Sequence, residues 1–186
     1  KNNELFIDLI FEKERPEKKK VGEVIGIDTG YRSLLATSNG ELIGTELKDK
    51  IKRAGKRRKS FHHYIETEIN RNLKKLNLNN VKTIVVENLK NVKKNKRGKF
   101  SRRSNRLLSF WHYNQALSRL RQLCEEEGVS VQIKSPYKTS QRCPYCGKID
   151  RRNRNGERFM CINCGYKENA DIVGALNQSI RVGGSI

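Results

Sequence analysis

The sequence predicts a mixed α/β fold that carries a small inserted module with four cysteines. Three observations support this prediction: short apolar runs typical of strands recur along the chain, segments with helical periodicity lie between them, and two Cys-x-x-Cys pairs lie toward the C-terminal end. With 186 residues, the chain is long enough for one ordinary domain and a small appended module. Strands followed by helices, after an initial antiparallel hairpin, indicate packed layers of both kinds of element.

The chain begins with a strand-like apolar stretch at residues 5–11 and a charged segment at 12–20, without an initiator methionine. We expect residues 1–20 to be a strand and a linker left from a missing N-terminal domain. Residues 21–47 indicate three short strands. Asn39 and Gly40 separate the second strand from the third, and Asn-Gly is typical of a two-residue type I′ hairpin turn.

Residues 48–77 place apolar side chains at offsets of three and four, which predicts a helix with one buried face. The β-branched run at 81–86 predicts a central strand that is covered on both faces. After a polar and basic stretch we expect a helix at 107–127, with Gly128 as its stop signal. A strand at 129–133 and a last helix at about 169–180 complete the predicted order.

The charge of the chain indicates a polyanionic partner. Forty Lys and Arg residues face only 20 Asp and Glu residues, which gives a formal net charge of +20. Such a surface repels itself unless an anion neutralises it, and the positive residues are clustered in blocks. The alternative is a basic protein whose charges only maintain solubility.

No apolar run reaches the length of roughly 20 residues that spans a bilayer, and no signal peptide is evident. We therefore expect a soluble intracellular protein without a membrane partner. In a reducing compartment, the five cysteines indicate metal ligands or buried thiols in place of disulfides.

Two Cys-x-x-Cys-Gly motifs predict one structural zinc ion. Their cysteines are Cys143, Cys146, Cys161 and Cys164. Each tight turn presents two thiolates, and two turns complete a tetrahedral sulfur shell that leaves no open position for water. A redox role is disfavoured, because two thioredoxin-like motifs have no need to lie so close together. We place this zinc ribbon at residues 139–166. The fifth cysteine, Cys124, lies in the helical pattern and is expected to be a buried thiol.

Three carboxylates occupy positions suited to metal binding. Asp28 and Glu87 each end an apolar strand, and Asp171 lies in the first turn of the last predicted helix. Carboxylates at strand ends face the edge of a sheet where ligands usually bind. Three of them can hold two Mg²⁺ ions, or Mn²⁺ in their place, for two-metal phosphodiester hydrolysis. Taken singly, each has an alternative role as a turn residue, a solvated strand end or a first-turn acid.

Two motifs give the sequence a specific resemblance. Thr139-Ser140-Gln141 precedes the first cysteine pair, and the pattern Asp171-x-x-x-Ala175-x-Asn177 follows the second. With the order of strands, acids and ribbon over residues 21–180, these motifs resemble the C-terminal half of transposon-encoded TnpB (OrfB) proteins and the related type V CRISPR effectors. The resemblance implies a RuvC-like nuclease domain of RNase H-like fold, at residues 21–138 and 167–186, that the zinc ribbon interrupts.

The resemblance also implies a function. Asp28, Glu87 and Asp171 match the acids that hold the catalytic metals of an RNA-guided DNA nuclease in that family. Guide RNA, target DNA and a missing N-terminal domain of the same protein are then the expected partners, in the cytoplasm of a prokaryote and near its nucleoid. One departure is the stretch Val173-Gly174-Ala175, where the family usually has Asn-Ala-Ala; we expect it to affect helix packing and not metal binding.

Two other functions are compatible with parts of the pattern. A nuclease-inactive, RNA-guided transcriptional regulator would keep the fold, although the three intact acids argue against it. The segment from Ile25 to Gly30 also resembles the first phosphate loop of an actin-like ATPase, but the chain lacks the second glycine-rich loop and the length of that fold.

Basic side chains that can neutralise phosphates are expected to bind nucleic acid. They lie in two blocks and beside the ribbon: Lys52, Arg53, Lys56, Arg57, Arg58, Lys93, Lys94, Lys96, Arg97, Lys99, Arg102, Arg103 and Arg142. Further arginines on the ribbon, Arg151, Arg152, Arg154 and Arg158, suggest that this module also touches nucleic acid. The alternative for each block is a solvated surface.

Overall fold

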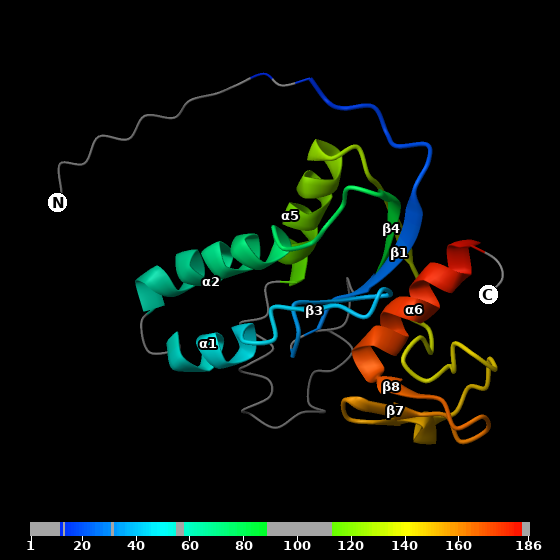
Figure 1. Ribbon diagram of the computed structural model, residues 1–186. Coiled ribbons are helices and arrows are strands. Elements are labelled where there is room, and N and C mark those ends of the chain that lie inside the picture. The colour runs from blue at the N-terminus through cyan, green and yellow to red at the C-terminus, as the bar shows by residue number, and fades with distance from the viewer. Residues whose placement is uncertain (1–11, 13, 31, 55–57, 89–112, 184–186) are drawn as a thin grey trace.

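The computed structural model describes residues 12, 14–30, 32–54, 58–88 and 113–183. Within these residues, the chain forms a central sheet with helices on both sides and a small cysteine-containing sheet below one end (Figure 1). The architecture confirms the predicted mixed sheet of RNase H-like topology with flanking helices and an added four-cysteine module. No helix among the described residues combines the length and apolar character needed to cross a membrane.

The central sheet has five strands in the order β3-β2-β1-β4-β5. Their bounds are Glu23–Asp28 for β1, Leu35–Thr37 for β2, Leu42–Ile43 for β3, Val81–Glu87 for β4 and Ser130–Lys134 for β5. Strands β1, β4 and β5 are parallel, whereas β2 pairs antiparallel with β1 and β3 pairs antiparallel with β2. Ile84, Val85 and Val86 are fully buried, which confirms that β4 is covered on both faces.

The hairpin between β2 and β3 is confirmed, but its predicted turn type is wrong. The amide of Thr37 donates to the carbonyl of Glu41, so residues 38–40 form a three-residue loop. Gly40 has a φ of 88°, whereas Asn39 is not among the described residues with positive φ. A type I′ turn needs positive φ at both central residues, and a three-residue loop needs it only at its last position.

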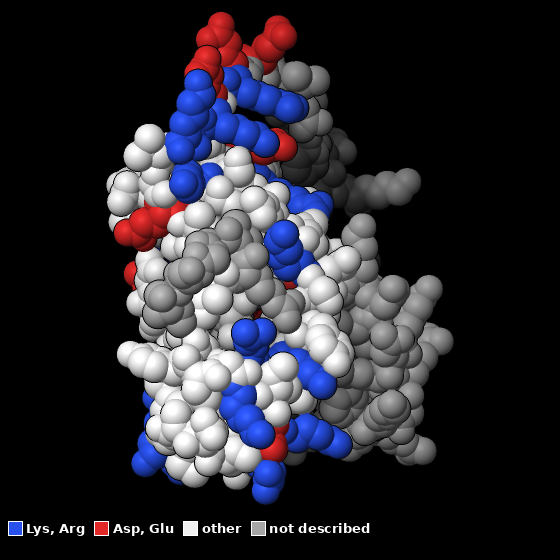
Figure 2. Space-filling view, turned by 90° about the vertical axis from the view of Figure 1, so that its right-hand side faces the viewer, with Lys and Arg blue, Asp and Glu red and all other residues white. Residues whose placement is uncertain are grey.

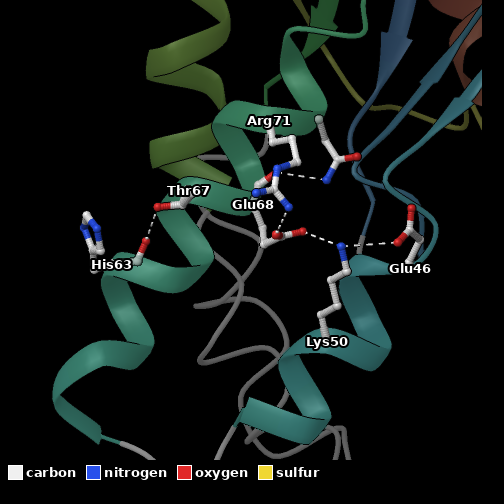
Figure 3. A network of polar contacts seen from close by, with 7 residues as sticks. Glu46, Lys50, His63, Thr67, Glu68 and Arg71 are labelled. Carbon is white, nitrogen blue, oxygen red and sulfur yellow. Dashed lines mark hydrogen bonds and ion pairs between the residues drawn. The ribbon is translucent and has the colours of Figure 1, made fainter.

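The predicted helix at 48–77 is two helices, α1 at Leu47–Ala54 and α2 at Arg58–Leu73. The side chain of Glu68, which is only 4% exposed, joins them. It accepts from Lys50 Nζ of α1 at 2.6 Å and from Arg71 Nη1 of α2 at 2.9 Å (Figure 3). Two cations on one buried carboxylate satisfy a group that would otherwise destabilise the interior, and the bond from Lys50 fixes α1 against α2.

The sheet is packed between two helical layers. On one face, α1, α2 and α5 (Tyr113–Glu126) enclose the main apolar core, to which Ile25 and Ile27 of β1 contribute. On the other face lies α6 (Ala170–Gly183), which crosses β1 and β4 (Figure 1). Residues 107–112, which we expected to begin the α5 helix, lie outside the described part of the chain.

Gly26 allows α6 to lie directly on β1. A Cβ atom built at Gly26 would be 1.8 Å from the carbonyl oxygen of Ala175 in α6, a contact that only a shift of the helix can relieve. We therefore expect Gly26→Ala to lower the free energy of unfolding by about 3 kcal/mol, measured by urea denaturation. Gly40→Ala is the control, because its Cβ meets nothing within 4 Å and only the positive φ costs about 1 kcal/mol. Equal effects of the two changes would contradict this account of helix packing.

The cysteine module is a three-stranded antiparallel sheet of β6 (Arg154–Asn155), β7 (Arg158–Met160) and β8 (Lys167–Asn169). A short 3₁₀ helix at Arg151–Asn153 precedes it. Strand β8 continues directly into α6, so the sheet reaches Asn169, beyond the predicted ribbon boundary at residue 166. Phe159 packs with Cys143, Cys161, Ala170 and Val173 in a second apolar cluster that joins the module to α6.

The charged segment at 12–20 contacts the domain near its end. The amide of Lys19 donates to the carbonyl of Gly128, and Lys19 Nζ donates to the carbonyl of Leu78 at 2.7 Å. Gly128 has a φ of 66° and ends α5 as predicted. A Cβ atom on Gly128 would lie 2.5 Å from the carbonyl oxygen of Glu17. The backbone of residues 17–19 therefore packs against the turn after α5.

Candidate active site

The first two acids meet at one edge of the sheet. Asp28 ends β1 and Glu87 ends β4, and these parallel strands pair with Ile27 opposite Val86. The next residue on each strand is therefore its acid, at the carboxyl edge where ligands of α/β sheets bind. Helix α6 crosses the same edge and supplies Asp171 from its first turn, with Oδ2 facing the Thr29-Gly30 turn after β1. The three predicted acids thus come together from three elements.

Asp28 is held in a strongly unfavourable environment for a negative charge. Burial, and then the neighbouring charges of Glu87 and Asp171, raise the pKa of Asp28 from 3.8 to about 8. Arg154 and the backbone amide of Thr29 act in the opposite direction. Without a cation, the three acids repel one another, and a divalent ion among them would remove this repulsion.

The raised pKa makes a prediction about stability. Because the folded chain binds the Asp28 proton more tightly than the unfolded chain does, Asp28 lowers stability progressively between about pH 4 and pH 8. We expect Asp28→Asn to be more stable than the wild type at pH 8, by about 2 kcal/mol or more, and equal to it near pH 4. Urea denaturation of the zinc-loaded chain without Mg²⁺ measures the difference.

The matched control for this measurement is Asp150→Asn. Arg152 lowers the pKa of Asp150 to about 2 through hydrogen bonds, so removal of this charge should give no gain at pH 8. A wild type that is as stable at pH 8 as Asp28→Asn would contradict the crowding of the three acids. Mg²⁺ should stabilise the wild type and not the variant, because only the wild type offers all three carboxylates.

Glu87 is buried and oriented by its neighbours. The hydroxyl of Thr139 donates a short hydrogen bond to Glu87 Oε1, and Gln178 Nε2 donates to the same oxygen at 2.9 Å. The backbone carbonyl of Glu87 accepts from the hydroxyl of Tyr113 at 2.7 Å. No described residue donates to Glu87 Oε2, so this oxygen is available to a cation.

Asp171 contacts the cysteine module. Arg154 Nη2 of β6 lies 3.0 Å from Asp171 Oδ1, and both side chains are largely shielded from solvent. The carboxamide of Asn169 accepts from the amide of Asp171 and so caps α6. A second ion pair, Arg32 with Glu157 at 2.7 Å, joins the turn after β1 to the module. The cysteine module therefore contributes a guanidinium group to the acid cluster.

Gly174 also lies at the acid cluster. A Cβ atom at this position would be 2.8 Å from Asp28 Oδ2. The expectation that the Val173-Gly174-Ala175 departure concerns helix packing alone is therefore incomplete. The glycine leaves the Asp28 carboxylate the room that an alanine side chain would occupy.

The four cysteines form a compact ligand set. Cys143 Sγ lies 3.6 Å from Cys164 Sγ, and Cys146 Sγ lies 3.5 Å from Cys161 Sγ, so the thiols are free and not disulfide-bonded. Among the described residues, only these cysteines bring at least three ligand atoms within 4.8 Å of one another. The three carboxylates are therefore spaced more widely than the sulfurs. Four converging sulfurs are the donor set of a structural zinc site.

The glycine that follows each Cys-x-x-Cys pair adopts a left-handed backbone conformation. Gly147 and Gly165 have φ values of 73° and 74°, which glycine adopts without strain. A hydrogen bond from the backbone of Lys148 lowers the pKa of Cys146 to about 6, whereas burial raises the pKa of Cys143 to about 12. Zinc binding must therefore displace at least one proton, and the affinity should fall as the pH is lowered.

Only some of the remaining predicted residues lie in the part of the chain that the structure describes. Cys124 is fully buried in α5, as expected, and burial raises its pKa to about 12. Arg142 is exposed beside the ribbon, while Lys52 and Arg53 lie in α1 and Arg58 begins α2. The other predicted nucleic-acid contacts lie outside the described residues: Lys56, Arg57, Lys93, Lys94, Lys96, Arg97, Lys99, Arg102 and Arg103.

Sequence reasoning missed three side chains at the acids. Thr139 was used only as part of a motif that carries the family resemblance, and Arg154 was named only as one of several ribbon arginines. Gln178 was not considered. Thr139 and Gln178 bond to Glu87, and Arg154 bonds to Asp171. The position of Thr139 in a motif was a signal, but nothing in the sequence pairs Arg154 with an acid 17 residues away.

Comparison with known proteins gives consistent matches. The family model described as "Cas12f1-like, TNB domain" matches residues 113–178. The CRISPR-associated endodeoxyribonuclease Cas12f1 of Sulfoacidibacillus thermotolerans is 42% identical over 76 residues, which cover 40% of this chain and 18% of that protein. A TnpB-like protein of Aquifex aeolicus is 34% identical over 98 residues, which cover 51% of this chain and 31% of that protein.

A solved structure extends the match to most of the fold. The Cas12f1 chain of a Cas12f1–sgRNA–target DNA complex superposes with a TM-score of 0.62 and 26% identity, and the alignment covers 83% of this chain and 49% of that chain. The alignments span less than a third of the two sequence relatives. The chain is therefore similar in sequence and fold to the TnpB-like and Cas12f1 proteins, and residues 113–178 correspond to the Cas12f1-like TNB domain.

Proposed function

We propose that this chain is the nuclease region of an RNA-guided, metal-dependent DNA endonuclease that works within a longer protein. The observation that carries the proposal is the meeting of Asp28, Glu87 and Asp171 at one edge of the sheet. Burial and mutual repulsion raise the pKa of Asp28, which is what an acid cluster built for a divalent cation shows. Relatives named as endodeoxyribonucleases support the reaction class.

Mg²⁺ fits the donors of this cluster. Carboxylate oxygens are the hard ligands that Mg²⁺ prefers, and a bound Mg²⁺ pair supplies an activated water and stabilises the leaving oxygen of a phosphodiester. Within this scheme, Asp28 interacts electrostatically with both other acids, and Glu87 offers Oε2. Arg154 brings a positive charge to Asp171 Oδ1, where its guanidinium can also donate to a phosphate oxygen.

One structural zinc ion would hold the cysteine module together. Cys143, Cys146, Cys161 and Cys164 fill all four positions of a tetrahedral shell, so the ion has no open position for catalysis. Its proposed role is structural. The ion would hold in place the strand that carries Arg154, and also the apolar cluster around Phe159 that packs on α6.

Guide RNA and target DNA are the proposed partners. The net charge of +20 favours polyanions, and Figure 2 shows Lys and Arg side chains over the face that includes the ribbon. A solved relative is in a complex with sgRNA and target DNA. Arg142 and the two predicted basic blocks are the proposed contacts. The proposal includes a location in the prokaryotic cytoplasm, beside the nucleoid.

A cleavage assay tests the proposal. The full-length protein that contains this region, loaded with guide RNA, should cut matched DNA when Mg²⁺ is present and should leave unmatched DNA intact. Omission of Mg²⁺ should abolish cutting without releasing the DNA. Binding without any cleavage, in Mg²⁺ or in Mn²⁺, would overturn the proposal in favour of a nuclease-inactive RNA-guided regulator.

A further inference from the structure

The Glu87 carboxylate is held asymmetrically. Both hydrogen bonds from side chains, from the Thr139 hydroxyl and from Gln178 Nε2, reach Oε1. The Thr139 hydroxyl also lies 3.3 Å from the carbonyl oxygen of Pro136, but a carboxylate is the stronger acceptor. Two donors on one oxygen fix the rotation of the carboxylate and leave the other oxygen to a ligand.

The side chain of Gln178 contains a buried, unsatisfied hydrogen-bond acceptor, which indicates a specific role. Its side chain is completely buried in α6, and its Oε1 has no hydrogen-bond partner among the described residues. A buried acceptor without a partner destabilises a protein, and such groups in native structures usually have a functional reason. Here the amide of the same side chain donates to Glu87.

The backbone turn that carries Thr139 is held by α6 and leads into the first cysteine of the ribbon. Asn177 Nδ2 of α6 donates to the carbonyl oxygens of Thr139 and Arg142, each at 2.8 Å. These bonds close residues 139–142, which lead directly into Cys143 of the ribbon. Cys143 in turn packs with Ala170 and Val173 of α6. The turn that carries Thr139 is therefore fixed by α6 and by the first zinc ligand together.

We propose that Thr139 and Gln178 are positioning residues that orient Glu87, so that Oε2 faces the divalent cation while Oε1 is occupied by their hydrogen bonds. This inference rests on the proposed function, because it assumes that the acids bind a divalent cation. It assigns roles to two side chains that do not touch the cation themselves. Hydrogen-bond partners behind a metal ligand commonly change metal affinity 10- to 100-fold when removed.

Mn²⁺ titration of the zinc-loaded chain, followed by electron paramagnetic resonance, tests the inference without any cleavage. Asp28→Asn defines which bound Mn²⁺ belongs to the acid cluster. For that Mn²⁺ we expect Thr139→Val and Gln178→Met each to raise the Kd by about ten-fold, whereas Thr139→Ser, which keeps the hydroxyl, should stay within about three-fold of the wild type. Thr83→Val, the same change on the strand of Glu87, is the matched control and should leave the Kd unchanged.

The outcomes separate this inference from the proposed function. Loss of Mn²⁺ in Asp28→Asn with unchanged affinity in both Thr139→Val and Gln178→Met overturns the inference and leaves the proposed acids in place. Unchanged affinity in Asp28→Asn overturns the acid site and the inference with it. Equal losses of Mn²⁺ affinity in Thr139→Val and Thr139→Ser would also overturn the inference. If the hydroxyl positions Glu87, the serine variant, which keeps a hydroxyl, must retain the affinity. Zinc content and the unfolding midpoint show whether each variant is folded. If Thr139→Val does not fold, the Mn²⁺ affinity of Gln178→Met alone decides whether the inference holds.

Discussion

Asp28→Ala in the full-length, guide-loaded protein should lower Mg²⁺-dependent cleavage of matched DNA by about a thousand-fold or more. A catalytic metal contributes several kcal/mol of transition-state stabilisation, and each 1.36 kcal/mol corresponds to about ten-fold in rate. The charges of both Glu87 and Asp171 act on Asp28, so its removal takes away the proposed metal ligand that interacts with both of the other acids. Single-turnover cleavage at saturating guide and DNA measures the loss in the chemical step.

The control for this variant is Glu41→Ala, which removes an exposed acid from the loop before β3. It should cleave at the wild-type rate. Guide and target binding by Asp28→Ala should also match the wild type, because the predicted nucleic-acid contacts are basic side chains that the substitution leaves unchanged. Cleavage within ten-fold of the wild type would remove Asp28 from the proposed site.

Cys161→Ser should remove the zinc ion and release the ribbon from α6. Cys161 is buried, lies 3.5 Å from Cys146 Sγ and belongs to the apolar cluster with Phe159 and Val173. Structural zinc sites contribute on the order of 10 kcal/mol to the folding of small metal-bound units, so the ribbon should not stay folded without the ion. We expect bound zinc to fall from one ion per chain to none.

The acid cluster should respond to the same change. Arg154 and Thr139 reach Asp171 and Glu87 from segments that the zinc ion shapes, so Mn²⁺ affinity at the acids should fall with the zinc content. Cys124→Ser is the control, because that thiol lies in the main core, and it should retain one zinc ion. Unchanged Mn²⁺ binding in Cys161→Ser would make the ribbon an independent module.

The strands of the central sheet could be predicted because local rules determine them. Asp28 and Glu87 directly follow apolar runs, and a parallel pairing of those strands is enough to bring both acids to one edge. The cysteine cluster followed from spacing alone, since two tight turns can close only one shell of four sulfurs. The proposed catalytic and metal-binding roles of the acids stay predictions.

Element boundaries depend on contacts that the sequence pattern does not show. The apolar offsets of three and four that predicted one helix at 48–77 run from Phe61 to Leu76, so they indicate α2 and do not show that α1 is a separate helix. The Asn39-Gly40 pair indicated the right hairpin and the wrong turn, because the register of β2 and β3 leaves three residues in the loop. Periodicity gives the type of an element more reliably than its ends.

The interactions around the acids could not be predicted because they join distant parts of the chain. Gln178 lies 91 residues from Glu87 and Thr139 lies 52 residues from it, so no local pattern relates them. The contact between Gly174 and Asp28 likewise depends on how closely α6 approaches β1, which the size of Gly26 decides. Such contacts follow from packing of the whole domain.

Anomalous diffraction from crystals of the zinc-loaded chain soaked in Mn²⁺ tests the proposed metal centre. We expect an anomalous peak between Asp28, Glu87 and Asp171, nearest to Glu87 Oε2, and a separate zinc peak among the four cysteines. Crystals of Asp28→Asn should keep the zinc peak and lose the first. Saturating Mn²⁺ with no peak at the three acids in the wild type would contradict the proposed metal centre.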